Sequence, residues 1–243
     1  MKKVLITGAS QGIGKAILEE LHNLDYDIYA TYNTGKDSAN NIEKELKNVK
    51  FFQCDFINTS EVDKLLDQIK DIKFDAVINN SGMIEFENFQ NFDFKIWQET
   101  FQVNLFTPLY LSINLQNNLN EGSSIINISS LDGLTGSFAS MAYSASKAAL
   151  INLTKSLGNN FGSKNVRVNA IAPGWIDTGM ATEESLEAVK TTPLGRNGNP
   201  EEVANLVTFL ISDKASFITG ETIIIDGGYG NVDNIMLEES KNI

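Results

Sequence analysis

Short apolar runs alternate with stretches of helical periodicity along almost the whole chain. The runs are uniformly apolar, which is typical of strands in a parallel sheet that is covered on both faces. They predict strands at Val4–Thr7, Asp27–Tyr32, Lys50–Gln53, Ala76–Asn79, Ser124–Ile128, Val166–Ala170 and Thr222–Ile225. Apolar residues three or four apart predict helices at Ile13–Leu24, Ser38–Leu46, Thr59–Ile69, Phe94–Leu119, Met141–Phe161 and Glu201–Leu210. Because strands and helices alternate without a break, we predict one doubly wound α/β domain, with a parallel sheet of about seven strands and helices on both faces.

Two segments interrupt this alternation. Residues 175–198 contain several glycines and Pro193, and they predict a long loop for which a substrate lid is the expected role. Residues 231–243 follow Asp226-Gly227-Gly228, where the last strand and its turn end, and they predict a C-terminal extension. The predicted domain therefore spans residues 1–230.

The composition narrows the class of protein. Of the 243 residues, 42% are hydrophobic and 21% are charged, which is typical of a globular domain. The 19 basic and 31 acidic residues give a net charge of −12, which argues against nucleic acid or an anionic membrane as a partner. A single cysteine, Cys54, excludes an internal disulfide, and no cluster of Cys and His predicts a metal site. Because no apolar run approaches the roughly 18 residues of a membrane helix, and the start of the chain does not resemble a signal peptide, we expect a cytoplasmic protein.

A glycine-rich loop joins the first predicted strand to the first predicted helix, with the sequence Thr7-Gly8-Ala9-Ser10-Gln11-Gly12-Ile13-Gly14. A helix N-terminus offers unpaired N–H groups and the positive end of the helix dipole, and both suit a pyrophosphate. Gly8 permits a tight turn, Gly12 lets the backbone approach the phosphates, and Gly14 allows close packing of helix on strand. The loop predicts a dinucleotide site, although glycines in such a turn can also be purely structural.

The residues after the second predicted strand bear on which dinucleotide binds. An acidic residue at the end of that strand would bind the adenosine ribose and exclude a 2′-phosphate, but the segment 31–36 carries none. Lys36, with Asn33 and Thr34, would instead meet a 2′-phosphate. We therefore predict that NADP(H) is preferred. NAD(H) is the alternative, in which Lys36 is an ordinary solvated turn residue.

Tyr143 and Lys147 are four residues apart in a predicted helix and so share one face, about 5–6 Å apart at their Cβ atoms. An ammonium group that close favours the phenolate, so we expect the pKa of Tyr143 to fall from about 10 toward neutral pH. Such a phenol is a useful general acid or base. Ser130 follows a predicted strand, where open α/β sheets bind ligands, and its hydroxyl would bind the same substrate oxygen. Each of these residues taken alone is also compatible with an ordinary helix surface or turn.

Together these motifs resemble a known family. The sequence is similar to a classical short-chain dehydrogenase/reductase (SDR) across residues 3–230, and its pattern resembles the 3-oxoacyl-carrier-protein reductases. The shared features are the glycine loop, Asn79-Asn80-Ser81-Gly82, Asn104, the set Ser130, Tyr143 and Lys147, Pro173-Gly174 and Asp226-Gly227-Gly228. The resemblance implies a Rossmann fold and an oxidoreductase that transfers hydride between a nicotinamide and a carbonyl or secondary alcohol.

The resemblance also implies four catalytic residues. Tyr143 would act as the acid/base, and Ser130 would polarise the substrate carbonyl. Lys147 would hold the nicotinamide ribose and lower the pKa of Tyr143. Asn104 would position a water that links Lys147 to solvent.

For the cofactor, the resemblance places Asp55 against the adenine, Asn80 beside the adenosine ribose, and Ile176 and Thr178 at the nicotinamide carboxamide. The residues expected to bind the cofactor are Gly8, Ser10, Gln11, Gly12, Ile13, Gly14, Asn33, Lys36, Asp55, Phe56, Asn80, Ser81, Gly82, Tyr143, Lys147, Pro173, Gly174, Ile176 and Thr178. Two positions depart from the family pattern. Ser81 replaces the usual Ala, and Gln11 stands where many NADP-dependent members carry Arg, which weakens the expectation of NADP(H).

The substrate is less sharply indicated. Met83, Ile84, Phe138 and Trp175 are candidate walls of the pocket, and an apolar lining suits a ketone or an acyl thioester. The acidic net charge counts against docking of an acidic carrier protein, although a local basic patch would allow it. A non-catalytic dinucleotide sensor is the rival class, but such proteins usually lose one of the four reactive residues, and all four are present. The resemblance further implies a homotetramer, with a dimer as the second choice.

Overall fold

The computed structural model describes the chain except residues 88–89, 91, 180–182, 234–235, 238 and 240–243. Part of the predicted C-terminal extension at 231–243 and three positions of the predicted lid at 175–198 thus lie outside the described residues.

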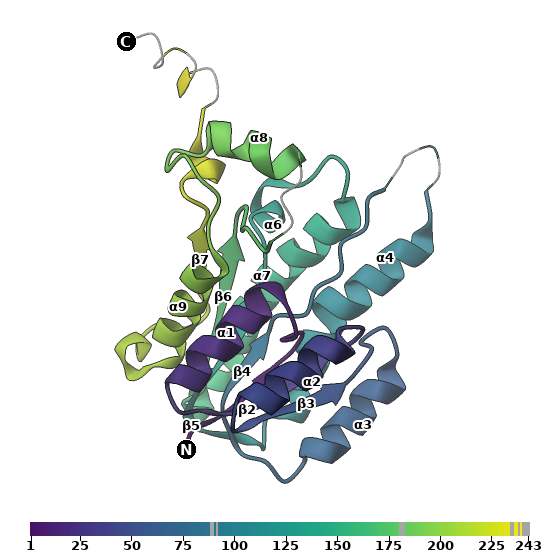
Figure 1. Ribbon diagram of the computed structural model, residues 1–243, viewed down its shortest axis with the longest axis vertical. Coiled ribbons are helices and arrows are strands. Elements are labelled where there is room, and N and C mark those ends of the chain that lie inside the picture. The colour runs from purple at the N-terminus through teal and green to yellow at the C-terminus, as the bar shows by residue number, and fades with distance from the viewer. Residues whose placement is uncertain (88–89, 91, 180–182, 234–235, 238, 240–243) are drawn as a thin grey trace.

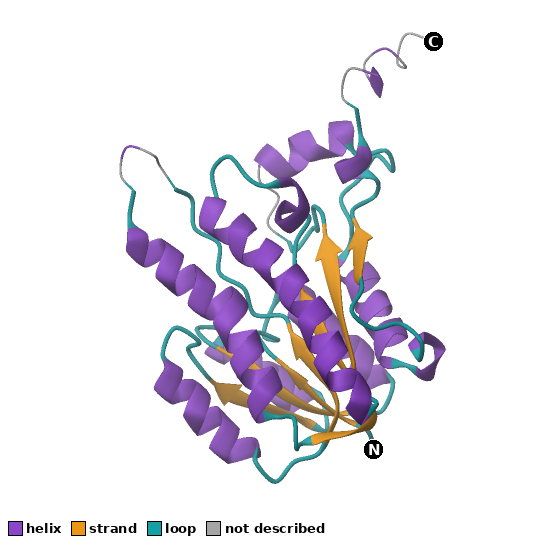
Figure 2. Cartoon of the chain, turned by 180° about the vertical axis from the view of Figure 1, so that it is seen from behind, coloured by secondary structure: helices purple, strands orange, loops and turns teal. Residues whose placement is uncertain are grey.

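The described residues form a seven-stranded sheet in which all neighbouring strands are parallel (Figures 1 and 2). Its order is β3-β2-β1-β4-β5-β6-β7. The strands are β1 (Lys3–Ile6), β2 (Asp27–Tyr32), β3 (Val49–Gln53), β4 (Phe74–Asn79), β5 (Leu119–Ile128), β6 (Arg167–Pro173) and β7 (Thr222–Ile225). The predicted fold class is confirmed. The strand order reverses between β1 and β4, and at such a point the two flanking loops separate and leave a crevice at the carboxyl ends of the strands.

Helices cover both faces of the sheet, because alternate apolar residues of each strand point to opposite sides. Val4 and Ile6 pack with α1 (Gly12–Asn23), α2 (Lys36–Glu45) and α9 (Pro200–Ile211). Leu5 and Val77 pack with α3 (Thr59–Ile69), α5 (Thr107–Asn114) and α7 (Met141–Phe161). The remaining elements are α4 (Phe94–Phe101), α6 (Asp132–Thr135), α8 (Glu183–Thr191) and the short turns η3 (Gly162–Lys164), η4 (Asp213–Ala215) and η5 (Tyr229–Asn231).

The helix predicted at Phe94–Leu119 differs most from the structure. It is divided into α4, a π-helical segment η2 (Gln102–Phe106) and α5, which ends at Asn114. Pro108 has no N–H to donate to the carbonyl of Asn104, four residues earlier, and a wider turn accommodates this loss. Leu119 instead begins β5, in which the next residues, Asn120 and Glu121, are polar, so the start of this strand gave no apolar run. The loop predicted at 175–198 also contains α8.

Candidate active site

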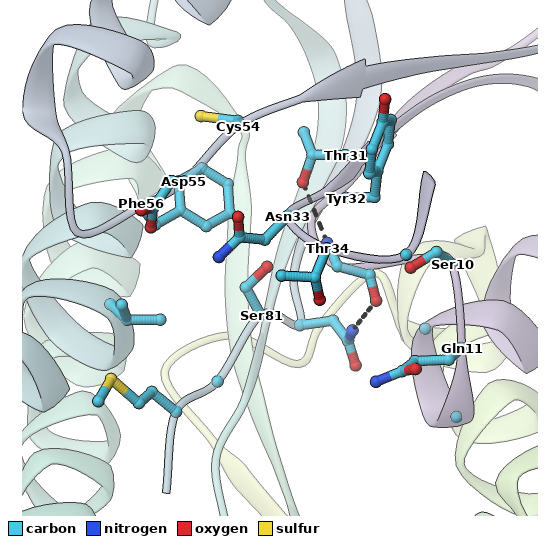
Figure 3. Close-up of a pocket in the computed structure, with 18 of the residues that line it drawn as sticks. Ser10, Gln11, Thr31, Tyr32, Asn33, Thr34, Cys54, Asp55, Phe56 and Ser81 are labelled. Atoms are coloured by element: carbon cyan, nitrogen blue, oxygen red, sulfur yellow. Dashed lines mark hydrogen bonds between the residues drawn. The ribbon is translucent and has the colours of Figure 1, made fainter. Parts of the chain in front are cut away.

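A cleft of about 620 Å³ lies at the carboxyl ends of the strands, at the point where their order reverses (Figure 3). It is formed by the loops that follow β1, β2, β3 and β4, with contributions from η2 and from the segment after β6. The lining residues are Gly8, Ser10, Gln11, Gly12, Ile13, Gly14, Thr31, Tyr32, Asn33, Thr34, Gly35, Cys54, Asp55, Phe56, Ile57, Asn80, Ser81, Gly82, Met83, Ile84, Val103 and Thr178.

Hydrogen bonds between separate loops hold the glycine loop in place. The N–H of Gly8 donates to Thr31 Oγ1 at 3.1 Å, and Asn80 Nδ2 donates to the Gly8 carbonyl at 2.9 Å (Figure 3). Thr7 Oγ1 accepts from the backbone N–H groups of Asn80 and Ser81, at 2.9 and 3.0 Å. The loops after β1, β2 and β4 are thus one connected unit.

The glycine loop is shaped for a phosphate group. Gly8 has a φ of +67°, which a residue with a Cβ rarely adopts, and a Cβ on Gly14 would overlap the Gly8 carbonyl and the Asn80 amide. Gln11, the N-cap residue of α1, makes no side-chain capping bond, so the first N–H groups of this helix face the cleft uncapped. Backbone N–H groups at a helix N-terminus bind pyrophosphate, so these residues fit a dinucleotide.

At the other end of the cleft, three of the residues expected near the adenosine line the cleft and one does not. Asn33, Asp55 and Phe56 line the cleft, whereas Lys36 is exposed as the first residue of α2 and lies outside the lining. Gly35 approaches Ser10 so closely that a Cβ would meet its Oγ at 2.5 Å.

Sequence reasoning did not single out Thr31, Tyr32, Cys54 or Val103 as lining residues. Thr31 was detectable in principle, since a polar residue near the carboxyl end of a parallel strand lies at the same edge as the ends of the neighbouring strands. Cys54 is buried, and burial together with the charges of Glu61 and Asp55 raises its pKa to about 12.

The four residues expected to be catalytic come together beside this cleft. The hydroxyls of Ser130 and Tyr143 are hydrogen-bonded to each other. Lys147 Nζ lies 5.6 Å from the Tyr143 ring centroid and donates to the Ile128 carbonyl at 2.8 Å. Asn104 and Lys147 flank Gly82, since a Cβ there would lie 3.8 Å from Asn104 Oδ1 and 3.5 Å from Lys147 Nζ.

The π-helical segment presents Asn104 to the loop after β4. Its Oδ1 accepts from the N–H of Met83 at 2.7 Å, and its Nδ2 donates to the Met83 carbonyl at 2.9 Å and to Ser146 Oγ at 3.0 Å. Asn104 thereby joins the backbone of the cleft wall to α7, the helix that carries Tyr143 and Lys147.

Burial determines the protonation of the two titratable residues. It raises the pKa of Tyr143 to about 12, although the hydrogen bond with Ser130 opposes the shift. Burial also lowers the pKa of Lys147 to about 8. The expectation of a lowered tyrosine pKa is therefore wrong, because desolvation of the phenolate dominates and the charge of Asp132 adds to it. Tyr143 holds its proton at neutral pH and is able to donate it.

In the segment after β6, Thr178 lines the cleft, whereas the other residues expected there to bind the cofactor do not. A Cβ on Gly12 would lie 3.4 Å from the Thr178 methyl group, so Thr178 reaches the glycine loop. Pro173, Gly174 and Ile176 are not among the lining residues.

Two backbone hydrogen bonds join the ends of this segment. The N–H of Asp177 donates to the Gly198 carbonyl at 2.8 Å, and the N–H of Gly198 donates to the Trp175 carbonyl at 2.9 Å. We call this contact between residues 175–177 and Gly198 the neck of the segment.

The candidate substrate residues divide in the same way. Met83 and Ile84 line the cleft, whereas Phe138 and Trp175 do not. Phe138 is fully exposed and Trp175 is 37% exposed.

Comparison with known proteins decides the family. A family model described as enoyl-(acyl carrier protein) reductase matches residues 8–230. The chain belongs to the short-chain dehydrogenase/reductase family. This SDR is 35% identical over 239 residues to the uncharacterized oxidoreductase YmfI of Bacillus subtilis (strain 168), covering 94% of this chain and 98% of that protein. It is 36% identical over 240 residues to the 3-oxoacyl-[acyl-carrier-protein] reductase FabG of Aquifex aeolicus (strain VF5), covering 93% of this chain and 96% of that protein.

Solved structures agree with this assignment. The SDR superposes on a blue fluorescent protein from a metagenomic library in complex with NADPH, with a TM-score of 0.89 and 29% identity, covering 94% and 97% of the two chains. It also superposes on 4-hydroxyisoleucine dehydrogenase complexed with NADH, with a TM-score of 0.88 and 30% identity, covering 96% and 100%. The protein is thus an NAD(P)-dependent short-chain dehydrogenase/reductase. Within the described residues, no helix is both long and apolar enough to span a membrane.

Proposed function

We propose that this SDR prefers NADP(H), acts on a carbonyl or secondary alcohol of the 3-oxoacyl thioester class, and uses Tyr143 as its acid/base. The bound nicotinamide supplies or accepts the hydride. The protein residues bind and orient the reactants and move the proton at the Tyr143 hydroxyl.

One observation carries this proposal: Tyr143 is hydrogen-bonded to Ser130 and lies one helical turn from the buried Lys147. Burial raises the pKa of Tyr143 to about 12, which supports a protonated hydroxyl at neutral pH. A substrate carbonyl oxygen that bonds both hydroxyls would receive its proton from Tyr143, while Ser130 polarises it. Below about pH 8 Lys147 carries a charge, and that charge stabilises the phenolate formed when the proton leaves.

The cofactor preference rests on the end of β2. Tyr32, Asn33 and Thr34 line the cleft there and bring no carboxylate to repel a 2′-phosphate. Lys36 lies just outside the lining, so backbone and amide groups would make most of the contacts to a 2′-phosphate. NAD(H) is the alternative, and proteins similar to this one are known with each cofactor.

The substrate class rests on the relatives and on the cleft wall. Several similar proteins are 3-oxoacyl-[acyl-carrier-protein] reductases. Met83 and Ile84 provide an apolar wall next to Gly82, which suits an acyl chain.

We further propose that residues 1–230 are the catalytic domain, that 231–243 are an extension, and that the chain forms a homotetramer, with a dimer as the second choice. Large exposed apolar side chains support this on α5, at Tyr110 and Ile113, and at Phe209 of α9 and Ile224 of β7. Such side chains are commonly covered in assemblies.

The first test follows nicotinamide absorbance with a short 3-oxoacyl thioester and with NADPH and NADH in parallel. A kcat/KM that is clearly higher with NADPH supports the cofactor proposal. Faster turnover with NADH overturns it while leaving the fold and catalytic set intact. No turnover with either cofactor contradicts the proposed substrate class.

The acid role of Tyr143 is tested by Tyr143→Phe, which removes only the hydroxyl. We expect kcat to fall by about 10²–10⁴-fold, the range for loss of a general acid. Tyr26→Phe is the matched control, because Tyr26 precedes β2 and so lies at the end of the strands opposite the cleft. Near-normal turnover of Tyr143→Phe would contradict the assigned role.

A further inference from the structure

Glu87 lies at the end of the wall segment 83–87, which follows Gly82. Its Oε2 accepts from the N–H of Ala142 at 2.6 Å, and its Oε1 accepts from Trp97 Nε1 at 2.5 Å. Its own N–H donates to the Ala139 carbonyl at 2.7 Å. One half-buried side chain therefore ties together the wall, α4 and the start of α7.

The start of α7 has no cap of its own. The N-cap residue Ser140 makes no side-chain capping bond, and the first turn holds no acidic residue. Ser140 Oγ is instead 2.7 Å from Ser137 Oγ. The carboxylate of Glu87, 55 positions earlier in the chain, satisfies one of the exposed N–H groups and faces the positive end of the helix dipole.

The position of this bond matters, because Ala142 immediately precedes Tyr143. The wall segment is also fixed at its other end, where Asn104 holds both backbone groups of Met83. Ile84 and Phe86, between the two anchors, are 50% and 77% exposed and have little packing to hold them. The anchors thus fix the wall relative to the catalytic helix.

We propose that Glu87 is a positioning residue that fixes the location of the Tyr143 hydroxyl relative to the wall segment 83–87. The proposal rests on the acid role of Tyr143 proposed above. Glu87 does not touch the reacting atoms. It acts through its hydrogen bond with the N–H of Ala142 and through its position at the end of the wall segment 83–87.

The test compares Glu87→Ala with Glu85→Ala. Glu85 belongs to the same segment and carries the same charge, but its side chain is exposed. We expect Glu87→Ala to lower kcat by about tenfold to a hundredfold, as for a displaced catalytic group, with substrate KM and cofactor Kd within about threefold of wild type. Glu87→Gln keeps one acceptor oxygen, so its kcat should lie between those of Glu87→Ala and Glu85→Ala. It takes the place of Glu87→Ala in the test if that variant does not fold.

A spectroscopic readout reports on the contact itself. The chain has two tryptophans, so in a Trp175→Phe background only Trp97 emits. Loss of the Glu87 acceptor should shift the Trp97 emission maximum, whereas Glu85→Ala should leave it unchanged. An unshifted maximum in Glu87→Ala overturns the proposal.

The kinetic outcomes separate the two hypotheses when Tyr143→Phe is assayed in parallel. In one outcome, Tyr143→Phe loses turnover while the kcat of Glu87→Ala, or of Glu87→Gln in its place, equals that of Glu85→Ala. Only the proposal for Glu87 then fails, even if the melting temperature of the Glu87 variant is lower. If Tyr143→Phe keeps its rate, the acid role fails, and the catalytic consequence proposed for Glu87 fails with it.

Discussion

At the nucleotide end of the cleft, the loops after β1, β2 and β4 are joined by hydrogen bonds through Thr7, Thr31 and Asn80. At the substrate end, large side chains of the surrounding segments lie in solvent, with Phe138 fully exposed and Phe86 and Leu194 exposed by 77% and 67%. The first region is shaped before any ligand arrives. The second presents large apolar side chains to solvent. Tolerance to substitution should therefore be lowest in the catalytic helix, where the two regions meet, and lower at the nucleotide end than at the substrate end.

The largest effect is expected at Lys147, where the two regions meet. Lys147→Met keeps an apolar stem and removes the charge, so turnover at neutral pH should fall by about 10²–10⁴-fold. The lowered pKa of Lys147 also predicts that the free energy of unfolding of the wild type rises with pH. The folded state holds fewer protons than the unfolded state between the folded pKa of about 8 and the ordinary value of 10.5. Wild type should therefore gain about 3 kcal/mol relative to Lys147→Met as pH rises across that window.

Denaturant unfolding of both proteins at several pH values measures this difference. A stability difference that does not change with pH would show that Lys147 is not buried as an ammonium.

A smaller effect is expected at the glycine loop. In Gly14→Ala the new methyl group overlaps the Gly8 carbonyl and the Asn80 amide, so stability should fall by about 1–3 kcal/mol and dinucleotide binding should weaken. Titration with NADPH and thermal unfolding measure the two effects. Gly162→Ala is the control, since Gly162 has a φ of −56° and no atom of a neighbouring group within 4 Å of an added Cβ. Equal behaviour of the two variants would contradict the rigidity assigned to this loop.

The smallest effect on stability is expected at the substrate end. Phe138→Ala should change the free energy of unfolding by no more than about 0.5 kcal/mol, because the ring makes no buried contacts to lose. If the ring covers bound substrate, the substrate KM rises while the dinucleotide Kd stays constant. A drop in stability of several times that size would mean that the ring is buried in solution, for example against a second copy of the chain.

The same contrast explains what the sequence could predict. The glycine loop and Asn80 were predictable because a strand end, a helix start and close backbone contact leave few residue types that fit. The break of the long helix at Asn104 had a signal in Pro108, yet the apolar period ran on through it. Glu87 gave no local signal, because its role depends on two partners from other elements. The tyrosine pKa was mistaken because the spacing of Tyr143 and Lys147 gives their separation but not their burial.

The neck between Trp175 and Gly198 also bears on how this protein could be re-engineered. Two hydrogen bonds of Gly198 join the ends of this segment, and the segment also contacts the body elsewhere, since the N–H of Leu194 donates to the Gly227 carbonyl at 3.2 Å. A Cβ on Gly198 would collide with Ile176, so the glycine itself keeps the two ends in contact. A grafted segment of different chemistry that keeps these contacts would alter which molecules the enzyme accepts while leaving the sheet as it is.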